Sequence, residues 1–124
     1  MTQILPIAAG GAIGALLRYW IAGAVQSLTG GSFPVGTLVV NVSGSLLMGF
    51  LYVLLLEQFD LGAGWRAGLL VGVLGAYTTF STFSIETLNL LETGEVLHAG
   101  LNVALSISLC ILGCWAGVVG GRAL

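Results

Sequence analysis

One stretch of the chain, residues 75–86 (GAYTTFSTFSIE), constrains the fold more than any other. It places five Ser and Thr side chains and two phenyl rings in the middle of an otherwise hydrophobic segment. Non-helical backbone at membrane depth survives only where it is buried in protein or lines a watery path. The stretch therefore predicts a functional break in a membrane-spanning helix, near residues 75–80.

The composition identifies an integral membrane protein. Charged residues make up 6% of the chain and the mean hydropathy is +1.08, whereas soluble domains carry about 25% charged residues. The connections between the apolar stretches are too short for a soluble catalytic domain, so no enzyme activity and no nucleic-acid partner are expected. Since a spanning helix needs roughly 20 apolar residues, we expect one all-α transmembrane domain over residues 1–124, with helices at about 4–28, 33–56, 67–91 with a central break, and 97–121.

The basic residues fix the membrane orientation only weakly. The chain has no Lys and three Arg, of which Arg66 and Arg122 are expected on one side of the membrane. Lys and Arg residues in short loops set the orientation of a membrane protein. Because two arginines give only a weak bias, either orientation could insert. Two copies could then pair antiparallel about an axis in the membrane plane, as in inverted-repeat transporters. We expect a dual-topology homodimer embedded in lipid.

Two helices carry polar or charged residues that need partners in a membrane. Thr37, Asn41 and Ser45 recur at helical spacing and form one polar stripe. The Asn41 carboxamide must find partners, so it either joins two helices or donates to a passing anion. Arg18 is costly in a spanning helix, so it either anchors the helix at the headgroups or pairs with Glu86.

The first helix also has a run of small residues, Gly10–Ala15, that would let another helix approach closely. The last helix carries Asn102, Ser106 and Cys110 at four-residue intervals. This track is a weaker polar face, and the same spacing would serve ordinary packing. Cys110 and Cys114 are interpreted as small buried hydrophobes, not as a disulfide or metal pair.

The break itself offers two kinds of ligand. Hydroxyl groups can satisfy the freed backbone groups, and the exposed carbonyl oxygens would favour a cation. Phe80 and Phe83 share one helical face, with Thr79, Thr82 and Glu86 adjoining it. Phenyl rings have positive edges, so this face could meet an anion, although aromatic pairs also pack.

Uncharged donors suit rapid passage of a small anion, because a fixed Lys or Arg would bind it and slow its exit. A proton-coupled transporter would instead need an acid inside the membrane. Residues 1–56 contain none, so only Glu86 could serve.

Three segments in order resemble the Fluc fluoride channels (CrcB-like proteins) of bacteria. They are Gly10–Tyr19 (GGAIGALLRY), Gly36–Asn41 (GTLVVN) with Gly44 and Gly49, and the break segment Gly75–Glu86. The last is the most specific of the three. The resemblance covers essentially the whole chain.

The resemblance implies an antiparallel homodimer with two separate fluoride pores at the subunit interface. It implies pore-lining rings at Phe80 and Phe83, and a structural sodium ion held by the backbone carbonyls of Gly75 and Thr78 from both subunits. From the resemblance we expect Tyr at the position of Asn102 and Ser at that of Cys110 in some members of the family, so the track departs from the family's pattern there. The remaining pore candidates are Asn41, Ser81, Thr82, Ser106, Asn102, Thr37 and Glu86.

The function expected from this resemblance is passive, fluoride-selective export of F⁻ from the cytoplasm through a multi-pass protein of the inner (plasma) membrane, which would confer fluoride resistance. Three alternatives remain. A small dual-topology, proton-coupled multidrug exporter would need an essential acid in the first helix. A cation channel would conduct through the carbonyls of Gly75 and Thr78, and a non-transporting assembly subunit would need no polar stripes.

Overall fold

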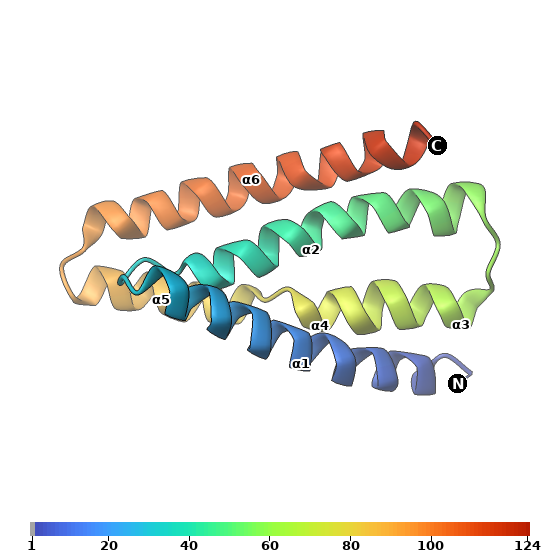
Figure 1. Cartoon of the computed structure of the whole chain (residues 1–124), viewed down its shortest axis with the longest axis horizontal. Helices are drawn as coiled ribbons and strands as arrows, with labels where there is room; N and C mark the ends of the chain where they lie inside the picture. Colours follow the sequence, from blue (N-terminus) through green and yellow to red (C-terminus); the bar gives the residue numbers. More distant parts are fainter. Residues whose placement is uncertain (1) are drawn as a thin grey trace.

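Four helical segments run through residues 2–124, the part of the chain that the computed structural model describes (Figure 1). Each is long and apolar enough to cross a membrane, and there is no strand among these residues. The all-helical architecture with four spanning segments is therefore confirmed. The segments are Ile4–Thr29, Val35–Gln58, Ala63–Glu92 and Val96–Arg122.

The first segment is the single helix α1 (Ile4–Thr29). The second and third segments are each made of several helices. The second joins α2 (Val35–Val53) to the π-helix η1 (Leu54–Gln58). The fourth is α6 (Val96–Arg122). The third contains α3 (Ala63–Arg66), the π-helix η2 (Ala67–Leu74), α4 (Gly75–Tyr77) and α5 (Phe80–Glu92).

The chain ends and the η1–α3 connection lie at one end of the molecule, and the other two connections lie at the opposite end (Figure 1). The α1–α2 connection is held by the side chain of Gln26. It donates to the carbonyls of Gly31 and Phe33 and accepts the N–H of Gly36, each at 3.0 Å. Gly30, in the left-handed region at φ 67°, ends α1.

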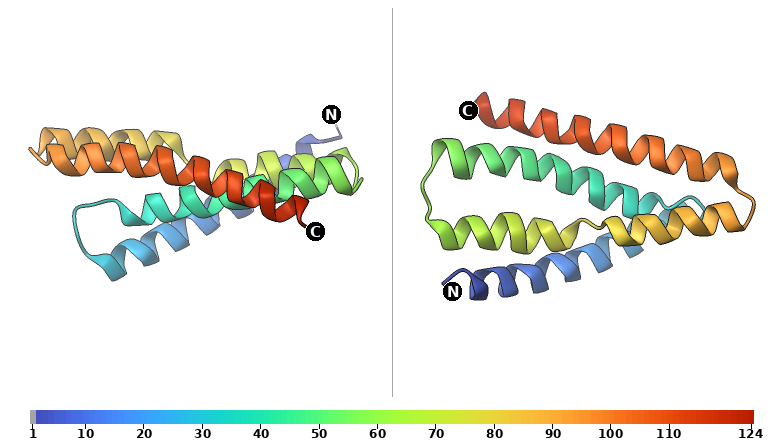
Figure 2. Two further views of the ribbon diagram at one scale, coloured as in Figure 1. Left: turned by 90° about the horizontal axis from the view of Figure 1, so that it is seen from above. Right: turned by 180° about the vertical axis from the view of Figure 1, so that it is seen from behind.

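Glycines bring the C-terminal parts of α6 and α2 into close contact, and the view from behind shows the two helices running side by side (Figure 2). A methyl group added at Gly49 would overlap the carbonyl oxygen of Cys114. One added at Gly117 would overlap the carbonyl oxygen of Leu46. Small residues at such positions let helix backbones approach in a membrane, where packing drives association.

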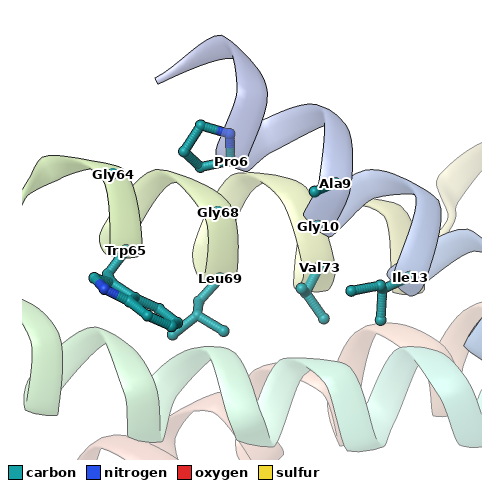
Figure 3. Close-up of a pocket in the computed structure, with 9 residues that line it drawn as sticks. All are labelled: Pro6, Ala9, Gly10, Ile13, Gly64, Trp65, Gly68, Leu69 and Val73. Carbon is teal, nitrogen blue, oxygen red and sulfur yellow. The ribbon is translucent and has the colours of Figure 1, made fainter. Parts of the chain in front are cut away.

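The small-residue run of α1 packs in the same way against η2. A methyl group at Gly10 would overlap the carbonyl oxygen of Gly68, and one at Gly14 would overlap that of Val73. Figure 3 shows this crossing, with Pro6 of α1 over Gly68. The close helix approach predicted for the run Gly10–Ala15 is confirmed at Gly10 and Gly14, and η2 is the helix that approaches.

The third segment is interrupted at Thr78 and Thr79. Thr78 has φ −87° and ψ 158°, and Thr79 has φ −150° and ψ 127°, so both are extended. The ribbon accordingly shows a short stretch without helix between α4 and α5 (Figure 1). The helix break expected near residues 75–80 is confirmed at these two residues.

Candidate functional site

The carboxamide of Asn41 holds the broken segment against α2. Its Nδ2 donates to the carbonyl oxygen of Thr79 at 3.0 Å, and its Oδ1 accepts the N–H of Thr79 at 2.8 Å. An extended residue inside a membrane leaves both backbone groups without helical partners, which is costly. The Asn41 side chain satisfies both the N–H and the carbonyl of Thr79. Of the two roles proposed for Asn41, these contacts directly show that of joining two helices.

The residues before the break are held from two sides. Ser43 donates to the carbonyl of Val39 at 2.7 Å, so the 3.0 Å contact between Ser43 Oγ and Tyr77 Oη has the tyrosine as donor. From α1, Nε of Arg18 donates to the carbonyl of Ala76 at 3.1 Å. Tyr77 is buried. The sequence interpretation missed it because a tyrosine in an apolar run gives no signal of a distant partner.

The residues after the break are held by a helix cap. Thr79 Oγ1 accepts the N–H of Thr82 at 3.2 Å, as N-cap residues do. The same oxygen lies 3.2 Å from the hydroxyl of Thr82 and 3.3 Å from that of Ser81. The hydroxyl cluster predicted around the break is therefore a connected group.

A cavity of about 310 Å³, here named the break cavity, opens beside the extended residues. None of its lining residues carries a charge. Thr78, Thr79 and Ser45 contribute to its wall beside the pore candidates. Its lining residues are Asn41, Ser45, Thr78, Thr79, Phe80, Phe83, Ser106, Ile107, Cys110 and Ile111.

A second cavity of about 290 Å³, here named the Arg18 cavity, shares the lining residue Thr79 with the break cavity. Thr37, Thr82 and Glu86 line it, together with Arg18. The carboxylate oxygen Oε1 of Glu86 is buried and has no hydrogen-bond partner among residues 2–124. The two cavities thus meet at Thr79, one of the two residues of the break.

The two phenyl rings lie together at the break cavity but in different surroundings. Their centroids are 5.4 Å apart and their planes are inclined by 47°. Phe83 is 9% exposed, whereas Phe80 is 78% exposed on the surface of a single copy. The pairing expected from their spacing is present, and the exposed ring leaves one side of the pair open.

The polar track of α6 is tied to Phe83 through Thr87, a residue that the sequence interpretation did not single out. Asn102 Nδ2 donates to Thr87 Oγ1 at 2.9 Å, and Thr87 Oγ1 donates to the carbonyl of Phe83 at 2.7 Å. Ser106 donates to Asn102 Oδ1 at 3.4 Å. Thr87 follows Phe83 by four residues, so helical spacing alone could have found it.

The predicted site residues therefore divide into three groups. Asn41, Phe80, Phe83 and Ser106 line the break cavity with Thr78, and Thr37, Thr82 and Glu86 line the Arg18 cavity. Ser81, Gly75 and Asn102 line neither cavity. Ser81 and Gly75 are exposed on the surface of the single copy, and Asn102 is buried beside Thr87.

One hypothesis needs correction. Arg18 and Glu86 line the same cavity, but no ion pair joins them within residues 2–124, because the guanidinium binds the carbonyl of Ala76 instead.

Cys110 and Cys114 are both free thiols. Within residues 2–124, no group of three or more His, Cys, Asp or Glu side chains could hold a metal.

A third cavity, of about 410 Å³, lies between α1 and the α3–η2 segment (Figure 3). Its wall is made of Pro, Ala, Gly, Ile, Trp, Leu and Val residues. Such a wall offers almost no group that could replace the water around an ion. The break cavity and the Arg18 cavity carry hydroxyl and amide groups and meet at the helix break, so they are the candidate path for a polar solute.

Comparison with known proteins gives the same family over nearly the whole chain. Residues 5–118 match the model described as CrcB-like protein, Camphor Resistance (CrcB). Three similar relatives are each named fluoride-specific ion channel FluC. They come from Methylococcus capsulatus (54% identical, 98% of this chain and 54% of the relative), Coxiella burnetii (50%, 98% and 99%) and Geobacter sulfurreducens (49%, 100% and 100%).

Proposed function

The chain belongs to the CrcB-like family, and on that premise we propose that it is a fluoride-selective passive ion channel of the plasma membrane. The four spanning segments and the channel names of the relatives support a multi-pass membrane protein that moves ions. The proposed direction is export. Fluoride that enters a cell as HF is trapped as the anion, and a passive channel lets it leave down its gradient, which confers fluoride resistance.

The observation that carries the proposal is the uncharged lining of the break cavity. Its polar groups are the Asn41 amide and the hydroxyls of Ser45, Thr78, Thr79 and Ser106, and the two phenyl rings lie beside them. Hydroxyl and amide donors can replace the water around a small anion, and the positive edges of the rings add to this. Without a fixed cation in the wall, the ion is not held and can pass on.

The proposed path continues through the Arg18 cavity. Thr79 lines both cavities, so an ion that leaves the break cavity meets Thr82 and Thr37 next. Glu86 lies in the same cavity. We assign the hydroxyls to the path and Glu86 to its wall, and the Arg18 guanidinium is turned to the carbonyl of Ala76.

A second copy of the chain completes the proposed pore. Ser81 and Ser84 are exposed on the spanning helix α5, next to the 78% exposed ring of Phe80. Both hydroxyls already have partners within the chain, Ser81 at Thr79 Oγ1 and Ser84 at the carbonyl of Phe80, so the surface that a second copy would cover is the exposed ring of Phe80 with these hydroxyls beside it. The weak basic bias permits the antiparallel pairing, with two pores at the interface and Ser81 of each copy facing its partner.

The proposed dimer holds a sodium ion at the break. The carbonyl oxygens of Gly75 and Thr78 accept no hydrogen bond within residues 2–124. Carbonyl oxygens are the ligands that hard cations prefer, so the residues fit such an ion. Gly75 and Thr78 of both copies would hold it, and the bound charge would join the copies without being transported.

Phenyl-ring variants test the proposal. The purified protein in potassium-loaded liposomes should release fluoride on addition of valinomycin, as followed with a fluoride electrode. Phe80→Ile and Phe83→Ile should each slow release by at least about tenfold, the equivalent of roughly 1.4 kcal/mol, with dimer assembly unchanged. Phe59→Ile, an exposed phenylalanine outside both cavities, should release fluoride like the unmodified chain. Unchanged release in both ring variants would contradict the aromatic-edge path.

A further inference from the structure

The hydrogen bonds around the break are arranged so that two carbonyl oxygens lose their usual donors. In an α-helix each carbonyl accepts the N–H four residues later. The carbonyl of Gly75 would thus accept from Thr79, and that of Thr78 from Thr82. Instead the N–H of Thr79 goes to Asn41 Oδ1 at 2.8 Å, and the N–H of Thr82 goes to Thr79 Oγ1 at 3.2 Å.

Three of the neighbouring carbonyls do have donors. That of Leu74 accepts both the N–H and the hydroxyl of Thr78, at 3.1 and 3.0 Å. That of Ala76 accepts Arg18 Nε, and that of Thr79 accepts Asn41 Nδ2. The carbonyls of Gly75 and Thr78, like that of Tyr77, have no donor within residues 2–124.

Two side-chain oxygens therefore replace two backbone oxygens as acceptors. Asn41 Oδ1 accepts the N–H of Thr79 and Thr79 Oγ1 accepts that of Thr82, which leaves the carbonyls of Gly75 and Thr78 without donors in the middle of a spanning segment. An unpaired carbonyl in a membrane costs several kcal/mol, so the arrangement is stable only if something else binds those oxygens. The exposure of Gly75 on the surface of a single copy leaves its carbonyl region open to a partner.

We propose that Asn41 and the hydroxyl of Thr79 are positioning residues for the cation, because they take the N–H groups that would otherwise occupy the carbonyls of Gly75 and Thr78. This inference rests on the sodium site of the proposed function. It also links the two sites of the channel. Asn41 lines the break cavity and, through Thr79, controls whether the cation ligands are free.

Matched variants at Thr79 separate the hydroxyl from the shape of the side chain. Thr79→Val keeps the shape and loses the oxygen, so the N–H of Thr82 returns to the carbonyl of Thr78. Thr79→Ser keeps the oxygen. Asn41→Leu tests the other diversion, and Thr93→Val is the control, since the Thr93 hydroxyl donates only to carbonyls of its own helix end.

The readout is the thermal stability of the detergent-purified protein as sodium replaces an organic cation, and it needs no ion flux. The unmodified chain, Thr79→Ser and Thr93→Val should be stabilised by sodium with the same half-maximal concentration. Thr79→Val and Asn41→Leu should need at least about tenfold more sodium, which corresponds to about 1.4 kcal/mol. If Asn41→Leu fails to fold, the Thr79 pair alone decides.

Identical sodium dependence in Thr79→Val and Thr79→Ser would overturn the proposal, as would an unmodified chain that sodium does not stabilise. These outcomes are distinct from failure of the proposed function, which is measured as fluoride release from liposomes. Loss of fluoride release in the presence of the expected sodium pattern would refute the channel and leave the positioning roles standing. Normal fluoride release without the expected differences in sodium dependence would refute the positioning roles and leave the channel standing.

Discussion

A single methyl group at Gly14 should disturb both the packing of α1 and the break. Built on the backbone, it would overlap the carbonyl oxygen of Val73 and lie 3.1 Å from the amide nitrogen of Tyr77, the residue just before the extended pair. Both neighbours are backbone atoms, so relief requires moving the helix. Overpacking of this kind costs about 1–3 kcal/mol.

Gly11 provides the matched control on the same helix. A methyl group there has no atom of the described chain within 4 Å apart from the nearby backbone of its own helix. Both substitutions replace glycine with alanine, so the change in helix propensity, up to about 1 kcal/mol, is common to both. The difference in the free energy of unfolding between Gly14→Ala and Gly11→Ala should therefore be about 1–3 kcal/mol.

The assay is unfolding in mixed micelles with increasing SDS, followed by the fluorescence of the three tryptophans. Fluoride release from liposomes is measured on the same samples. Gly14→Ala should unfold at lower SDS and release fluoride more slowly, because the displaced backbone leads directly into the break. Equal unfolding midpoints for the two variants would refute the reasoning that backbone contact at Gly14 sets the position of α1.

Two further predictions concern contacts away from the break. Glu57→Gln removes the ion pair with Arg122, in which the closest atoms are 2.9 Å apart. Because exposed ion pairs are weak and screened by salt, the unfolding midpoint should barely change. A large drop in the midpoint that does not depend on salt would contradict this. Asn102→Leu removes the 2.9 Å hydrogen bond to Thr87 and should lower the free energy of unfolding by about 0.5–2 kcal/mol. It should also slow fluoride release, since Thr87 binds the carbonyl of Phe83; release at the unmodified rate would argue against that link.

The helix break could be predicted from sequence because the capping groups are local. Thr79 and Thr82 are three residues apart, which is the spacing at which an N-cap hydroxyl meets an amide. The small-residue run at Gly10 and Gly14 was likewise enough to predict a close helix approach. It did not say which helix approaches, because any apolar helix could have used the same groove.

The partners of the polar side chains could not be predicted. Asn41 meets Thr79 across 38 residues, and nothing local distinguishes that contact from a free donor. Arg18 was considered as a partner of Glu86, and the acid does lie in the same cavity. The break supplies an acceptor at the carbonyl of Ala76, which in an uninterrupted helix would accept the N–H of Phe80.

The measurement that tests the central claim most directly compares fluoride and chloride release from potassium-loaded liposomes that contain the purified protein, with sodium present and valinomycin added. The account predicts rapid fluoride release, because the break cavity offers uncharged donors and phenyl edges, and, as the proposed fluoride selectivity requires, no chloride release. A folded protein that releases no fluoride, or that releases both anions at similar rates, would contradict it.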